Sequence, residues 1–146
     1  MGKQEEIPEK LLFLELESNI KKIRERFNTL LKKHESNVTF DQWLVLKEIA
    51  VNQGANQKCI ATKLAKEVAS ISRMLTKLSL KKLILKKSNT YNMREFKLYL
   101  SPDGFELIDK IDKSIKKEFE TIFSGIYEQE LNLVSRIFSR INADLK

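Results

Sequence analysis

The sequence predicts a mostly α-helical fold with one small β-hairpin, and three observations support this prediction. Apolar residues recur at steps of three and four over long stretches near both ends of the chain, which is the period of an amphipathic helix. Between residues 96 and 100 apolar and polar residues alternate, which is the period of a half-buried strand. Glycine and proline number only four and two in 146 residues, so helices are seldom interrupted.

The first predicted helix begins at Pro8 and ends near Lys33. Proline suits a first turn, because its missing N–H would have no helical partner there. One apolar stripe runs along this helix, made of Leu12, Leu16, Ile20, Ile23, Phe27, Leu30 and Leu31. A helix of about 25 residues is roughly 37 Å long and overhangs a small domain. Core packing is the simplest role for the stripe, but we favour a contact with a partner chain along part of it.

A second helix is predicted from Thr39 to about Asn52. Thr39 followed three residues later by Gln42 is typical of a capping box, in which each side chain bonds to the other residue's backbone N–H. Trp43 lies in the first turn of this helix and is most simply a core residue. Its indole N–H needs a partner when buried, so a pocket-lining role is the second interpretation.

The stretch from Asn56 to Leu100 carries most of the positive charge. It holds eleven Lys or Arg residues against two Glu residues, a net charge of +9, while the whole chain has +7. Such a segment attracts a polyanion, because every cation that meets a phosphate releases a condensed counterion. A solvated charged face is the alternative, and the charge alone does not separate the two.

The pattern inside this stretch favours a DNA-binding motif. Asn56 can cap a short helix, and a second helix is predicted over residues 68–82, with Ile71, Met74 or Leu75, and Leu78 inward. Its outward residues are Ser70, Ser72, Arg73, Thr76 and Lys77. A hairpin follows, with strands near 83–87 and 95–100. Helix, helix and hairpin make a winged helix-turn-helix, predicted over residues 38–100, whose second helix presents its first turns to base edges. On the hairpin, Lys86, Lys87, Arg94 and Lys97 place charge within reach of phosphates or the minor groove.

Several short motifs in order resemble the MarR family of transcriptional regulators. The segment Ser72-Arg-Met-Leu-Thr-Lys-Leu78 resembles the family's recognition helix, and Asn92-Met-Arg94 followed by Leu100-Ser-Pro-Asp-Gly104 resembles the end of its wing. The resemblance implies that Ser70, Ser72, Arg73 and Lys77 contact the major groove, and that Arg94 contacts the minor groove or its flanking phosphates. Lys82 stands where the family usually has glycine, so we expect that helix to end without the usual left-handed glycine cap. Asn92 replaces the usual wing aspartate.

Residues 101–146 predict two further amphipathic helices, separated near Ser124 and Gly125. Ser101 and Pro102 provide the cap and the first turn. Because the apolar stripes of residues 101–146 match that of residues 7–34, we expect both regions to form a homodimer across a two-fold axis. Such a dimer would place two recognition helices about one DNA turn (~34 Å) apart and predicts a pseudo-palindromic target.

No catalytic, cofactor or metal site is predicted. The single histidine, His34, excludes a histidine cluster, and no glycine-rich phosphate loop is present. We interpret Asp112 as a solvating residue and Cys59 as a small side chain packed in a helix, with a chemical switch as the alternative for Cys59. The charged N-terminus and the lack of a long apolar run predict a soluble, cytoplasmic protein without a membrane segment.

The sequence therefore favours a non-enzymatic, homodimeric repressor that binds double-stranded DNA. The resemblance further implies a small apolar or aromatic effector, bound between the dimer helices and the DNA-binding lobe, with Phe13, Trp43 and Leu46 as candidate pocket residues. The alternative is a basic interaction module that binds RNA or an acidic protein.

Overall fold

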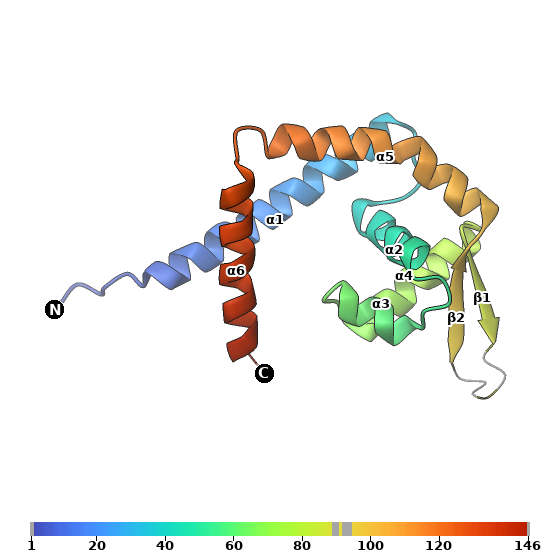
Figure 1. Ribbon diagram of the computed structural model, residues 1–146, viewed down its shortest axis with the longest axis horizontal. Helices are drawn as coiled ribbons and strands as arrows, with labels where there is room; N and C mark the ends of the chain where they lie inside the picture. The colour runs from blue at the N-terminus through green and yellow to red at the C-terminus, as the bar shows by residue number, and fades with distance from the viewer. Residues whose placement is uncertain (1, 89–90, 92–94, 146) are drawn as a thin grey trace. The chain divides into compact units, whose positions relative to one another are not determined.

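The computed structural model describes residues 2–88, 91 and 95–145, and it confirms the predicted fold class. Within these residues the chain forms six helices and two strands (Figure 1). They are α1 (Pro8–Lys33), α2 (Phe40–Val51), α3 (Gln57–Lys63), α4 (Val68–Leu80), β1 (Ile84–Ser88), β2 (Phe96–Leu100), α5 (Pro102–Ile122) and α6 (Glu128–Asp144). The chain divides into two compact units, Met1–Ser114 and Ile115–Lys146, and α5 begins in the first and ends in the second.

The first turns of α2 hold several neighbouring segments of the first unit. The predicted capping box is present: Thr39 Oγ1 accepts the N–H of Gln42 (3.1 Å), and Gln42 Oε1 accepts the N–H of Thr39 (3.2 Å). Asp41 accepts a hydrogen bond from Arg24 Nε of α1 at 3.0 Å and pairs with Lys66 Nζ, just after α3, at 3.3 Å. Because two cations converge on one carboxylate, α2 fixes the end of α1 beside the turn between α3 and α4.

Three helices end with a left-handed residue that is not glycine. Glu35, Ala65 and Lys82 have φ angles of 55°, 52° and 61°. After α4, the N–H of Lys82 bonds to Ser79 O and that of Leu83 bonds to Leu78 O, which is the hydrogen-bond pattern of a Schellman motif. The helix ends without a glycine cap, as expected, but Lys82 itself takes the left-handed conformation. The cap forms with lysine in the position that glycine usually takes, and its two hydrogen bonds offset the strain.

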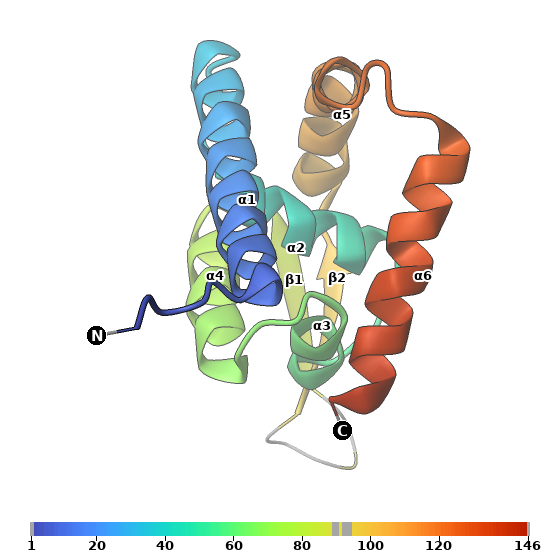
Figure 2. The same ribbon diagram turned by 90° about the vertical axis from the view of Figure 1, so that its left-hand side faces the viewer.

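The predicted hairpin is present, and β2 has a second neighbour that the sequence did not indicate. β1 and β2 pair antiparallel, with Ile84 opposite Leu100 and Lys87 opposite Lys97 (Figure 2). On its other edge β2 receives the segment before α3: Gly54 N–H bonds to the carbonyl of Leu98 (2.8 Å), and Leu98 N–H bonds to that of Ala55 (2.9 Å). The hairpin is thus attached to the helix-turn-helix through its backbone.

The start of α5 is locked to the end of α4. Ser101 Oγ accepts the N–H of Gly104 (3.0 Å) and donates to the carbonyl of Lys82 (2.7 Å), so the predicted cap also binds the left-handed lysine. A Cβ on Gly104 would lie 2.2 Å from Leu83 O, which is a backbone atom. The close approach of two backbone segments therefore requires glycine at position 104.

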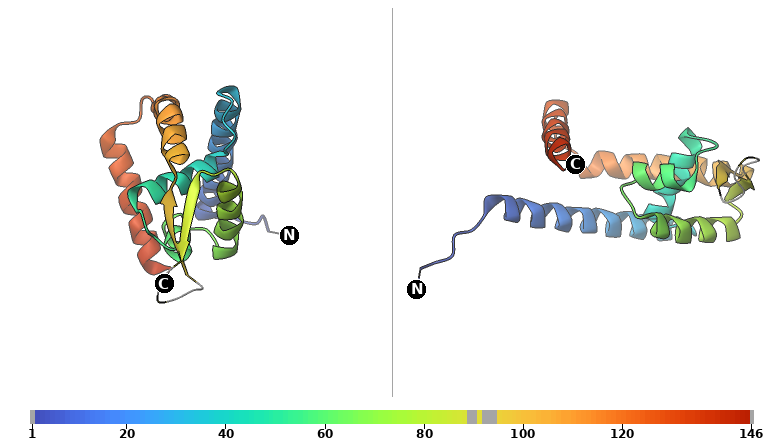
Figure 3. Two further views of the ribbon diagram at one scale, coloured as in Figure 1. Left: turned by 90° about the vertical axis from the view of Figure 1, so that its right-hand side faces the viewer. Right: turned by 90° about the horizontal axis from the view of Figure 1, so that it is seen from below.

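The hydrophobic core lies among α2, α3, α4 and the hairpin, which pack against one another in the first unit (Figures 1 and 3). Fully buried side chains there include Val45, Leu46, Ile49, Ile60, Ile71, Leu78 and Leu98. On α1 only Phe27 and Leu31 are buried, whereas Phe13 is 58% exposed. In the second unit, α6 has no buried residue.

Candidate nucleic-acid interface

The helix-turn-helix is built from α3 and α4, as predicted. Asn56 caps α3 because its Oδ1 accepts the N–H of Cys59 (2.8 Å). Gln57 Nε2 donates to the carbonyl of Val68 at the start of α4 (3.3 Å), which joins the two helices. The buried side chains of α4 are Ile71, Leu75 and Leu78, so Leu75 and not Met74 fills the second inward position. This burial turns the remaining side of α4 outward.

The outward side of α4 carries the four residues that were expected to meet DNA. Arg73 and Lys77 are exposed, while Ser70 and Ser72 are half-buried beside them. In the part of the chain that the structure describes, neither Arg73 nor Lys77 forms an ion pair. Two hydroxyls and two cations without a carboxylate partner suit hydrogen bonding to base edges and phosphates.

The hairpin divides its lysines between two faces. Residues opposite each other in an antiparallel pair share a face, so Lys87 and Lys97 lie together, whereas Lys86 shares the other face with Leu98. Lys87 Nζ lies 4.8 Å from the ring centroid of Tyr99, which steadies the ammonium over the aromatic face. The fourth predicted wing cation, Arg94, lies outside the described residues.

A hollow of about 340 Å³ separates the inner hairpin face from the two helices. Its polar lining includes Ser72 of α4, Lys58 of α3 and Lys86 of β1, together with Asn56 and Glu95. Leu75, Phe96 and Leu98 provide apolar walls. Lys58 was not among the predicted contact residues, although a cation in the first turn of the first helix of the motif was a usable signal.

Lys81 connects the end of α4 to the loop between α1 and α2. Its Nζ donates to Gln42 Oε1 (3.1 Å) and to the carbonyl of Asn37. Burial lowers the pKa of Lys81 from its ordinary value of 10.5, and the nearby charge of Lys77 lowers it further. The two hydrogen bonds join the end of α4 to α2 and to the loop before it.

The three candidate effector residues differ in burial and in their place in the first unit. Leu46 is fully buried, and Trp43 is 9% exposed and stacks on Phe40. Phe13 lies 14 residues before Phe27 on α1, about 20 Å along a helix. A pocket formed by all three stays a prediction that needs a further contributor.

Two smaller expectations were wrong. Asp112 does not merely solvate its helix, because it accepts a hydrogen bond from Trp43 Nε1 (2.9 Å) and pairs with Lys47 Nζ (2.6 Å). This contact supplies the partner that the buried indole needs. Cys59 is exposed and not packed, because the inward positions of α3 are taken by Ile60 and Ala61.

The described residues contain neither a cluster of metal ligands nor a membrane-spanning helix. No group of three or more His, Cys, Asp or Glu side chains in those residues lies together so as to hold a metal ion. No helix among them is long and apolar enough to cross a membrane.

The comparisons with known proteins agree on the architecture. A MarR/EmrR family transcriptional regulator from an Acinetobacter species superposes with a TM-score of 0.84 at 14% identity, over 96% of this chain and 98% of that chain. The chain has the winged-helix fold of the MarR regulators. The MepR–DNA complex of S. aureus superposes with a TM-score of 0.77 at 19% identity, over 95% of this chain and 99% of that chain. The PcaV transcriptional regulator of Streptomyces coelicolor, in complex with its natural ligand, superposes with a TM-score of 0.75 at 15% identity, over 100% of both chains.

The superpositions show the MarR fold. No model of a known protein family matches the sequence, and a search of curated proteins finds no match.

Proposed function

We propose that this chain is a transcriptional regulator that binds double-stranded DNA of a specific sequence as a homodimer. The observation that carries the proposal is the exposed face of α4, where Arg73 and Lys77 stand beside two serines on the second helix of a helix-turn-helix. The MarR fold supports it, because MepR has been solved with DNA in the same fold. In this proposal α4 enters the major groove and Arg73 binds a guanine through two hydrogen bonds.

The hairpin lysines contact the DNA backbone in this proposal. Lys87 and Lys97 face each other across the two strands, and like charges in that arrangement repel. A phosphate between them relieves the repulsion, so the hairpin is better suited to a polyanion than to bulk solvent. Lys86, on the other face, lines the same hollow as Ser72 of α4. For Arg94 we propose, from the MarR resemblance alone, a contact with the minor groove or its flanking phosphates.

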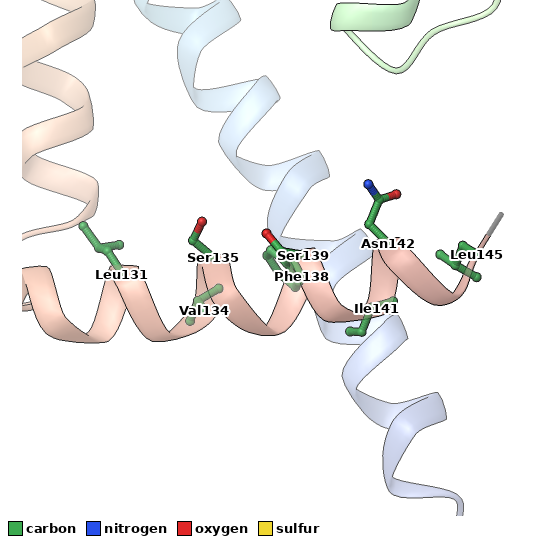
Figure 4. A pocket seen from close by; sticks show the side chains of 8 residues that line it. All are labelled: Leu131, Val134, Ser135, Phe138, Ser139, Ile141, Asn142 and Leu145. Carbon is green, nitrogen blue, oxygen red and sulfur yellow. The ribbon is translucent and has the colours of Figure 1, made fainter.

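Homodimerisation is proposed because apolar surface is left uncovered on both terminal regions. On α6 a row of apolar side chains points along one side of the helix, and Leu131, Val134, Phe138 and Ile141 are each 42–46% exposed (Figure 4). On α1, Phe13 and its neighbours are similarly exposed. A two-fold dimer that covers these faces presents two copies of α4 to half-sites about 34 Å apart.

Repression by occlusion of a promoter, and release by a small apolar or aromatic effector, complete the proposal. The ligand complex of PcaV supports an effector in this fold. Trp43 is the single tryptophan of the chain, so its fluorescence reports directly on ligands near it. Screening aromatic and apolar acids for a saturable change in this emission, with release of bound duplex as the second readout, tests the effector.

The experiment that tests the function is selection of bound duplexes from a random library, with light scattering on the complex. A pseudo-palindrome with half-sites about one helical turn apart, bound by a dimer, is the expected result. Recovery of no sequence preference would overturn the proposal. Tight binding to structured RNA or to an acidic protein instead would replace it with a general basic interaction module.

Arg73→Ala gives the residue-level test on the selected duplex. We expect a loss of about 1–3 kcal/mol in binding free energy and relaxed preference at one base pair per half-site. Lys116→Ala is the matched control, because it removes one exposed cation from α5 outside the proposed interface. Equal losses on specific and random duplex would mean that Arg73 contacts only phosphate.

A further inference from the structure

Asn56 makes two side-chain hydrogen bonds to elements that are far apart in the sequence. Its Oδ1 caps α3 through the N–H of Cys59 (2.8 Å). Its Nδ2 donates to Glu95 Oε1, across a separation of 39 residues. Glu95 directly precedes β2, so one amide joins the first helix of the motif to the root of the hairpin.

The backbone next to this contact strengthens the same connection. Ala55, just before Asn56, accepts the N–H of Leu98, and Gly54 donates to the carbonyl of Leu98. The segments 54–56 and 95–98 are therefore joined by two backbone hydrogen bonds and one side-chain bond. The backbone bonds hold the strand, and the side-chain bond acts at its beginning, where the chain leaves the hairpin loop.

Glu95 is also an unexpected charge at this place. It is one of only two acidic residues between Asn56 and Leu100, and it lines the hollow that also holds Ser72, Lys58 and Lys86. A carboxylate among the cations of a DNA-binding face repels phosphate unless its position is controlled. Its hydrogen bond here goes to a neutral amide, and the described residues show no salt bridge from Glu95 to a lysine.

We propose that Asn56 and Glu95 are positioning residues that fix the root of the hairpin against α3, so that the hairpin lysines and α4 reach one duplex together. This inference rests on the proposed DNA-binding function. Neither residue needs to touch DNA: Asn56 keeps the carboxylate turned toward α3, and the strand that follows carries Lys97. Without the bond, β2 is still joined to the segment before α3 by the backbone of Leu98 and by Gln53 Oε1, which accepts the N–H of Leu100 (3.2 Å). No described hydrogen bond then holds Glu95 itself, and its carboxylate can turn toward the neighbouring cations.

Four variants of the full chain separate the bond from the charge. Asn56→Ser keeps a good helix cap and the net charge but has no second polar atom for Glu95. Asn56→Asp keeps the cap and places two carboxylates face to face. Glu95→Gln removes the charge and keeps an acceptor for Asn56. The double variant Asn56→Asp with Glu95→Gln restores both a hydrogen bond, with reversed polarity, and the original net charge.

Affinity for the selected duplex and its salt dependence are the readouts, and urea unfolding verifies that each variant is folded. For Asn56→Ser we expect affinity to fall about fivefold and the salt slope to fall by about one, because phosphate contacts of the hairpin are lost. For Asn56→Asp we expect a loss of about tenfold or more. The double variant should return to within about twofold of the original chain, with its salt slope restored. A purely structural role would alter the folded fraction but not the slope.

Two results would overturn the inference while the proposed function stands. One is an Asn56→Ser protein with unchanged affinity and slope on the selected duplex. The other is that Glu95→Gln improves affinity for the selected duplex by the same factor whether residue 56 is Asn or Asp. Equal factors would mean that the two positions act independently and are not coupled. If the original chain selects no duplex sequence, the proposed function fails and the inference fails with it. This outcome differs from the two above, in which the original chain still selects a duplex.

Discussion

The winged-helix lobe, residues 38–100, and α6 have equally regular apolar patterns but opposite environments. The lobe buries its apolar positions within the chain, with Val45, Ile60, Ile71 and Leu78 all at 0% exposure. The apolar positions of α6 repeat at helical spacing, yet none of them is buried. Periodicity in a sequence therefore shows which side of a helix is apolar, but it does not show whether the same chain covers that side.

The helix α1 contains both environments in one element. Phe27 and Leu31, near its end, are buried, and the Phe27 ring stacks on Phe40 at 4.5 Å between centroids. Leu12 and Phe13, near its start, are about half exposed. Because uncovered apolar area costs free energy in water, the contrast predicts that a second copy covers the terminal faces and leaves the lobe unchanged.

The largest effect is expected for Phe138→Asp in α6. In a two-fold dimer the change occurs twice and places a carboxylate in each apolar face, so dimerisation should weaken by about 4 kcal/mol or more. Sedimentation or light scattering over a dilution series measures the shift to monomer. Urea unfolding of the lobe should change little.

Asn132→Asp is the matched control for that variant. It adds the same charge to the same helix on the side away from Phe138. A control that dissociates the dimer as strongly as Phe138→Asp would show that net charge, and not the apolar face, governs assembly. A lobe destabilised by Phe138→Asp would contradict the separation between the two regions.

Two glycines allow the same substitution to be compared at a packed position, against Leu83 of the lobe, and at an open one, before α6. A Cβ at Gly104 meets the backbone oxygen of Leu83 at 2.2 Å, whereas a Cβ at Gly125, between α5 and α6, meets nothing within 4 Å. We expect Gly104→Ala to lower the free energy of unfolding by about 3 kcal/mol through overpacking. Gly125 has a φ of 82°, so Gly125→Ala should cost only the local strain, about 1 kcal/mol. Equal losses in urea unfolding would refute the difference in packing.

A stabilising change is expected at Lys82. Glycine at this left-handed position removes the backbone strain that a side chain causes. Part of this gain in stability is offset, because glycine raises the conformational entropy of the unfolded chain. The free energy of unfolding of Lys82→Gly should rise by about 0.5–1 kcal/mol. Ser79→Gly is the control three residues earlier, where helical geometry makes glycine unfavourable by about 1 kcal/mol. A less stable Lys82→Gly protein would show that the lysine side chain contributes more than the strain costs.

These variants also mark what could be predicted from the sequence. The bounds of α1 and α2, the capping box at Thr39 and the cap at Asn56 were predicted and are confirmed, because caps and periodicity act within a few residues. The left-handed lysine was missed because a non-glycine residue in that conformation leaves no local signal. The alternation of neighbouring residues in a strand was available, however, and would have placed Lys86 and Lys87 on opposite faces.

Contacts between distant residues could not be predicted from one sequence. Asp112 lies 69 residues from Trp43, and Glu95 lies 39 residues from Asn56. Nothing in the local pattern of either acid differs from that of a solvated residue, and only the packing of helices and hairpin brings each to its partner. The outward side of α4 could be predicted because the spacing of apolar residues along a helix is a local pattern. The contacts of its residues with DNA stay a prediction.

The smallest effect concerns the pH dependence of the contact between the lobe and the α1–α2 loop. The pKa of Lys81 is lowered in the folded protein, first by burial and then by Lys77, while the unfolded chain has the ordinary value of 10.5. Between the two values the unfolded chain binds more protons, so stability should rise with pH on approaching 10.5 and level off above it. Lys81→Met should remove this rise, whereas Lys86→Met, on the exposed hairpin, should keep it. Urea unfolding at several alkaline pH values measures the slope, and a rise that persists in Lys81→Met would assign the slope to another group.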